Sequence, residues 1–385
     1  MTLKVALALG FSLAMTASTA NAQTNQEYAK FDPAARTWEL NFQQQSAEDD
    51  SDADWQTFRY EIRNKIRPAV RSTIHQKDGG FTYRYRVSNH RSAQQIVNYV
   101  YAWTPITPLP PKKPNPTGAE LNASPQLMRA WQLQLDQRLQ EMRAMQDASL
   151  SQPEGWRRKM SFDTAEIGFG WFPTIEPYGP GIPPGRSAGG FEIRRPELPG
   201  ATYAKMQGRV DEPGLPTGYK PGGPVEQAIK EIIATDQVYV PILAPTITLP
   251  VPYSTAEHAR RLKVHAQTWL GDETHSPMVS TDVLNRLNRQ FDALIPALEG
   301  NNKAAARAAV IEMFKEGFGH HQGLNHHKLN EDDEDQDAEA LPHKIKARAG
   351  AQQEPPKKPL TIHRVPARAL AFNLLYLLTR MEIGR

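Results

Sequence analysis

The sequence predicts an α+β protein: an antiparallel β-sandwich with a helical insertion, followed by a small helical domain. Short stretches of alternating apolar and polar residues, separated by Gly, Pro and Asn, fill residues 53–222, a pattern typical of a sandwich. One long amphipathic pattern interrupts them at about 118–150, and helical periodicity dominates from residue 254 to the end of the 385-residue chain.

The first 22 residues have the pattern of a secretory signal peptide. Lys4 precedes an apolar run at 5–15, which is shorter than the ~20 residues that a membrane span requires. Ala20-Asn21-Ala22 then forms a small-residue processing site. We expect cleavage after Ala22 and a periplasmic or secreted protein with no membrane span; the alternative is a buried N-terminal helix. Residues 23–52 are polar and are predicted to be a flexible N-terminal arm.

Composition excludes several classes of site. The chain has no cysteine, which rules out disulfides, thiol nucleophiles and thiolate zinc sites. Its 45 basic and 42 acidic residues nearly balance. Nucleic-acid-binding proteins normally present a strongly basic face, so this balance argues against a nucleic-acid partner.

Alternation of apolar and polar residues locates the predicted strands. The clearest stretches are 57–62, 81–87, 96–103, 160–162, 166–172, 190–194 and 203–208.

The helical insertion has clear boundaries. Ser124 is a favourable N-cap, and Pro125 suits the first helical position. An apolar stripe at three- and four-residue steps then predicts a helix over about 125–147: Met128, Trp131, Leu135, Leu139, Met142 and Met145. We expect this stripe to cover an open edge or face of its own sandwich. The alternative is that it docks a partner, with Trp131, Leu135 and Met142 as the binding residues.

Residues 223–253 are predicted to connect the two parts, with a short helix at 225–234 and an extended run at 238–252. Helices are then expected at about 254–270, 281–299 and 302–317, and a last one has Pro366 near its start. An insert at about 318–360 combines paired histidines, six acidic residues among the seven at 331–337, and a Pro/Lys run. Such a composition predicts disorder.

Some of the strand and turn residues are similar to those of a known architecture. Tyr83-x-Tyr85-x-Val87-x-Asn89, the segment 182–191, Leu198-Pro-Gly200 and Gly208 resemble the Ig-like β-sandwiches of uncharacterised secreted bacterial proteins that carry an appended helical region. The resemblance covers about 55–210 and implies an Ig-like fold. It implies no activity, because this scaffold serves many functions.

Gly185-Arg-Ser187-Ala-Gly189 matches the G-x-S-x-G pattern of serine hydrolases, with Asp236 and His258 as available partners. The context differs from a nucleophile elbow, because prolines precede the motif and a strand pattern follows it. A loop that enters a strand explains the motif better.

Two histidine pairs form the candidate metal site: His320, His321, His326 and His327. Neutral imidazoles bind zinc, copper or nickel, and the acidic run could add ligands. The alternative is a solvated segment with adventitious metal affinity. His258 and His265 lie seven residues apart on one predicted helix, and packing histidines are expected there rather than a ligand pair.

These observations together favour an exported, non-enzymatic envelope or extracellular interaction protein without a cofactor, whose partner is an envelope protein. A metal-binding protein acting through 320–337 and a serine hydrolase at Ser187 are the alternatives.

Overall fold

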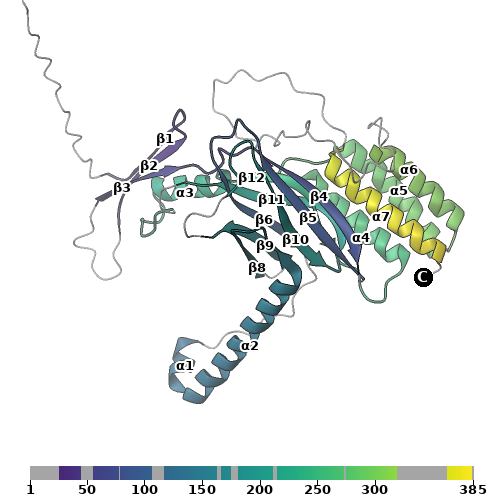
Figure 1. The fold of residues 1–385 in the computed structure, drawn as a ribbon, viewed down its shortest axis with the longest axis horizontal. Helices are drawn as coiled ribbons and strands as arrows, with labels where there is room; N and C mark the ends of the chain where they lie inside the picture. Colours follow the sequence, from purple (N-terminus) through teal and green to yellow (C-terminus); the bar gives the residue numbers. More distant parts are fainter. Residues whose placement is uncertain are drawn as a thin grey trace, which may run out of the picture. The chain divides into compact units, whose positions relative to one another are not determined.

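The structure, a computed structural model, describes residues 26–44, 55–77, 79–105, 117–162, 166–174, 181–210, 215–272, 275–318 and 362–383. These residues form a mixed α+β fold with antiparallel sheets and seven α-helices, which confirms the predicted class at that level (Figure 1). The predicted signal peptide lies outside the described residues, as does the predicted insert after Phe318. No helix in the described ranges is long and apolar enough to cross a membrane.

The chain divides into two compact units. The first contains the residues up to Tyr60 together with 214–229. Its sheet has the strand order β1 (Tyr28–Asp32), β2 (Thr37–Gln43) and β3 (Trp55–Glu61). The expectation of a flexible arm is therefore wrong for β1 and β2. Strand β3 pairs with β2 in this sheet, whereas residues 57–62 were predicted to belong to the sandwich.

Local packing explains why this N-terminal segment folds. β1 and β2 pair antiparallel, and Phe31 lies opposite Trp38 with ring centroids 5.1 Å apart. Phe42 is buried and packs edge-on against Tyr219. Its polar composition conceals this core, because few apolar positions such as Leu40 and Phe42 are fully buried.

The second unit contains two further antiparallel sheets. One has four strands in the order β4 (Pro68–Lys77), β5 (Gly80–Asn89), β10 (Ser187–Arg195) and β7 (Leu150–Ser151). The other has five strands in the order β12 (Val238–Ile247), β11 (Leu198–Gly208), β6 (Val97–Pro105), β9 (Glu166–Pro173) and β8 (Trp156–Phe162).

The buried faces of these two sheets share one core. The Tyr85 hydroxyl on β5 donates to the Leu243 carbonyl on β12 at 2.9 Å. Trp171 on β9 packs edge-on against Phe191 on β10, with centroids 5.7 Å apart. Both rings are almost fully buried, so aromatic contacts join the sheets.

Strand β4 was not predicted, and the reason lies in its buried positions. Ser72 is buried where an alternating strand would have an apolar residue. Its Oγ accepts a hydrogen bond from the Leu243 backbone at 3.3 Å. A polar residue that is satisfied by a neighbouring strand removes the period-two signal.

The C-terminal helices of this unit are α4 (Thr255–Gln267), α5 (Thr281–Glu299), α6 (Lys303–Phe318) and α7 (Arg364–Ile383), close to the predicted bounds. Helix α7 packs on β11 and β12 and α4 packs on β12, while α5 and α6 pack mainly against the other helices. Their buried residues belong to the same core cluster as those of the two sheets. The predicted domain boundary at residue 254 is therefore wrong. The segment 223–253 was predicted to be a connection, but it contains β12, a buried strand of the five-stranded sheet.

Candidate functional site

Helix α2 (Pro125–Ser149) is the most distinctive element between β6 and β7. It begins as predicted: the Ser124 hydroxyl accepts a hydrogen bond from the Leu127 backbone at 3.2 Å. A short helix, α1 (Gly118–Ala123), precedes and contacts it. Figure 1 shows α2 running away from the strands, with its C-terminal end at the sheets.

Only the last turns of α2 are anchored by hydrogen bonds to a described strand. Gln146 accepts a hydrogen bond from the Met160 backbone at 3.0 Å, and Asp147 forms an ion pair with Arg158. Both partners belong to β8. The ion pair is largely exposed and contributes little, so the backbone bond and the packing around it define this attachment.

The apolar stripe is left exposed along the free part of the helix. Leu135 is 39% exposed, Leu139 41% and Met145 39%, whereas Trp131 and Met142 are half-buried. The expectation that the stripe covers the sandwich is therefore wrong for Leu135, Leu139 and Met145. The three candidate binding residues, Trp131, Leu135 and Met142, lie on one face of this helix.

The residues of the hydrolase motif do not form a nucleophile elbow. Ser187 is the exposed first residue of β10 and lies opposite Ser88 on β5. Gly185 has φ of +74° in the preceding turn, and the strand register shifts between Ala188 and Phe191. The motif is thus a turn followed by a β-bulge.

The two possible partners of Ser187 have other roles. Asp236 is buried, and its carboxylate accepts a hydrogen bond from the Arg63 backbone. His258 is fully buried against α7. Ser187 lies opposite Ser88, whereas Asp236 binds the Arg63 backbone and His258 binds Asn373. These three residues therefore have separate partners.

The four histidines of the candidate metal site, His320, His321, His326 and His327, lie outside the described residues, as does the acidic run. Within the described ranges, no group of three or more His, Asp or Glu side chains is arranged to hold a metal ion.

His258 belongs to a buried polar network instead. The Asn373 amide nitrogen donates to the Pro199 carbonyl at 2.6 Å and to the Ala369 carbonyl at 2.8 Å. Its oxygen must therefore accept from His258 Nε2, 2.8 Å away. This fixes the proton on Nε2 and leaves a lone pair on Nδ1, which has no hydrogen-bond partner. Burial lowers the pKa of His258 to about 4.

His265 is a second buried packing residue. Its Nε2 lies 3.2 Å from the Thr246 hydroxyl of β12, and its ring meets Trp269 edge-on. Burial lowers the pKa of His265 to about 4, partly offset by a hydrogen bond to the Ala201 backbone. Since the two histidines have separate partners, they are packing residues rather than a ligand pair.

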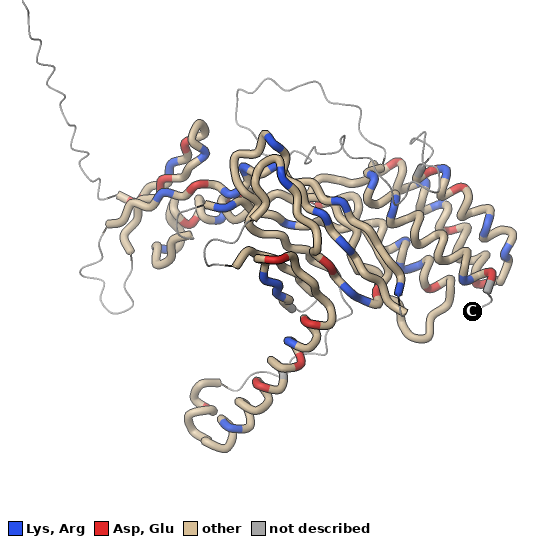
Figure 2. Tube along the Cα trace, viewed as in Figure 1, with Lys and Arg blue, Asp and Glu red and all other residues tan. Residues whose placement is uncertain are grey.

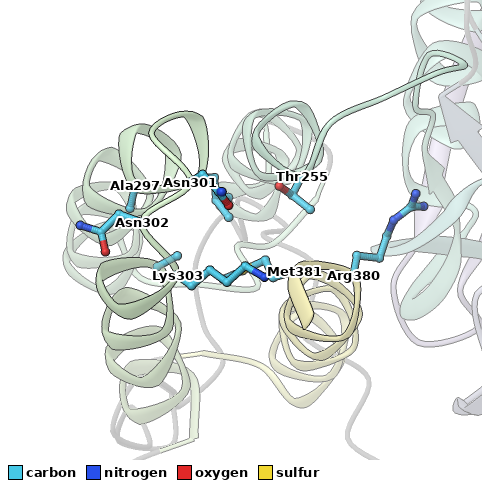
Figure 3. A pocket seen from close by; sticks show the side chains of 9 residues that line it. Thr255, Ala297, Asn301, Asn302, Lys303, Arg380 and Met381 are labelled. Atoms are coloured by element: carbon cyan, nitrogen blue, oxygen red, sulfur yellow. The ribbon is translucent and has the colours of Figure 1, made fainter. Parts of the chain in front are cut away.

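A small hollow lies at one end of the helices, with a volume of about 220 Å³. Thr255, Lys303 and Arg380 are among the residues that line it (Figure 3). Drug-sized ligand sites typically span about 300–1,000 Å³. The Arg380 guanidinium also lies 4.5 Å from the centre of the Tyr253 ring, so this cation already has a partner.

Comparison with known proteins finds no matching family model, no similar curated sequence and no similar solved structure.

Proposed function

We propose that the chain is an exported, non-enzymatic interaction protein of the cell envelope or extracellular space, and that α2 is its partner-binding element. The observation that carries the proposal is the exposed apolar stripe of a helix attached near one end. Contiguous apolar surface of this kind marks protein–protein interaction sites. The signal-peptide pattern of residues 1–22 supports the compartment.

The partner that fits this surface is an envelope protein with an apolar helix or groove. Side chains at three- and four-residue steps present the anchors of helix-in-groove recognition. Trp131 is the expected main contact, because tryptophan dominates binding energy at protein interfaces. As part of the same proposal, the two sheets form an Ig-like sandwich, and α1 and α2 are its helical insertion.

Site-specific photo-crosslinking in the producing cells tests this function. A photoreactive residue at Leu135 should form a covalent adduct with another protein. The same residue at Gln140, which is exposed about 140° around the helix from Leu135, should not.

The adduct should disappear when Trp131 and Met142 are both changed to Ala. Equal crosslinking from positions 135 and 140, or crosslinks from 135 to the same molecule alone, would contradict the proposed role of α2.

A further inference from the structure

The outer face of the four-stranded sheet is strongly basic. Phe81, Tyr83, Tyr85 and Val87 are buried on β5, so the residues between them face outward. At outward-facing positions the strands of this sheet carry one acidic residue, Glu192, against five basic ones: Arg71, Lys77, Arg84, Arg86 and Arg194. Figure 2 shows the blue segments recurring along β4 and β5.

The register places two of these cations side by side. Arg71 on β4 lies directly opposite Arg86 on β5, and both are exposed. Like charges in directly opposite positions repel one another, so the strand register concentrates positive charge at this point of the face. Glu192 lies 2.8 Å from Arg84 and 3.1 Å from Arg194 and thus balances the charge of a different part of the face.

More arginines surround one end of the sheet. Buried Asn89 accepts a hydrogen bond from the Arg67 backbone at 3.1 Å, and its own backbone donates to the Arg186 carbonyl at 2.9 Å. Arg91 follows two residues later. The side chains of all three arginines are exposed, so one polar hub gathers three cations at the end of the basic strands.

The positive region continues onto the start of α7. Arg368 is largely buried there, and burial together with the charges of Arg364 and Arg71 lowers its pKa to about 10. Since the charge of Arg71 acts on Arg368, an anion near Arg71 would also be attracted by Arg368.

The remaining side chains on this face are short and polar. Thr73, Thr82 and Ser88 lie between the arginines, and none of the exposed large hydrophobic residues in the described chain belongs to these strands. The face therefore lacks the aromatic side chains on which nucleic-acid bases stack and the apolar side chains that insert into a bilayer.

We infer that this arginine face, defined by Arg67, Arg71, Lys77, Arg84, Arg86, Arg91, Arg186 and Arg194, docks on the phosphate headgroups of an anionic phospholipid membrane. Guanidinium groups match phosphate with paired hydrogen bonds. Ten-residue strands extend about 33 Å and adjacent strands lie about 5 Å apart, so the cations spread over a broad face rather than along one groove. The attraction is electrostatic and independent of the role proposed for α2.

Vesicle co-sedimentation of the mature protein tests this inference. The probes are vesicles of phosphatidylcholine alone and vesicles with about one-third phosphatidylglycerol, at low and at high salt. We expect binding to the anionic vesicles only, and loss of that binding at high salt.

An R71Q/R86Q variant should bind anionic vesicles about 30-fold more weakly, the effect expected for two cations near an anionic surface. An R289Q/K303Q variant removes the same charge from exposed positions on α5 and α6 and should bind within about twofold of the parent protein. Because both positions are exposed, R71Q/R86Q should keep the parent's circular dichroism and should change its melting temperature little.

Three results would overturn the inference. The first is equal binding to neutral vesicles, and the second is an equal loss of binding in the two variants. The third is failure to bind anionic vesicles at low salt, including the case in which the arginine face instead binds a synthetic acidic peptide or RNA.

Discussion

The backbone of Gly200 on β11 lies against the imidazole of His265 on α4, so closely that a Cβ atom at position 200 would overlap both Nε2 of that ring and the Thr246 hydroxyl. Gly200 is buried and has an ordinary strand conformation. The glycine is thus required by the close approach of a helix to the sheet and not by a left-handed backbone.

Gly200→Ala should consequently destabilise the protein by about 1–3 kcal/mol, the usual cost of overpacking a core. Urea unfolding followed by circular dichroism measures the change. Gly189→Ala is the matched control, because a Cβ at that position meets no atom within 4 Å. Similar losses in the two variants would mean that helix–sheet contact at Gly200 is looser than described.

The two buried histidines should make stability depend on pH. Their pKa of about 4 lies below the value of about 6.5 in an unfolded chain. Between these values the unfolded state binds more protons, so the free energy of unfolding should decrease as pH falls from about 6.5 to 4. The loss should reach about 3 kcal/mol for each histidine and should not develop above pH 7.

Urea unfolding at intervals between pH 7.5 and 4 measures this slope. His258→Gln should reduce it, because one of the two groups that gain protons on unfolding is gone. His75→Gln, at an exposed position of β4, provides the comparison. An unchanged slope in His258→Gln would show that other groups cause the pH dependence.

Asn373 should contribute more to stability than a typical hydrogen-bonding residue. Asn373→Leu leaves the buried Pro199 carbonyl and His258 Nε2 without their partner, and an unsatisfied buried group costs about 1–3 kcal/mol. We expect a loss of about 2–4 kcal/mol in urea unfolding. Adding His258→Leu should recover part of that loss, since both members of one pair are then apolar. A double variant less stable than the sum of the single variants would contradict this network.

Because the stripe of α2 is exposed, replacing one of its apolar side chains by Ala should hardly change the stability of the protein. Leu135→Ala should change the free energy of unfolding by less than about 0.5 kcal/mol, as exposed substitutions do. Leu287→Ala on α5 removes a fully buried side chain and should cost about 2–5 kcal/mol. If the two changes cost the same, the stripe is covered within its own molecule, and α2 is no binding element.

Local patterns identified many elements but not their partners. The predicted helix over 281–299 matches α5, because its cap and apolar stripe lie within one segment. Ser72 conceals β4, because its hydrogen-bond partner Leu243 is far away in the chain. The helix pattern alone likewise could not predict whether the apolar stripe around Trp131 is buried, since its burial depends on where the strands lie.

The net charge of the whole chain likewise did not predict the arginine face. A net charge of +3 gives no sign of the arginine face, because acidic residues elsewhere, such as those at 331–337, cancel it in the sum. Alternation on β5 indicates which residues share a face, but only the strand register places Arg71 opposite Arg86. The arginine face therefore depends on pairings that composition cannot supply.

The bond from Asn373 to the Pro199 carbonyl has a consequence for how this protein can be divided. The Asn373 amide gives the Pro199 carbonyl a hydrogen-bond donor at a point where the β11–β12 register is irregular. The same side chain also accepts a hydrogen bond from His258 on α4. Sheets and helices of the second unit should accordingly melt in a single calorimetric transition. A polypeptide starting at residue 254 would not be an exchangeable module, because its helices α4 and α7 pack on strands that come earlier in the chain.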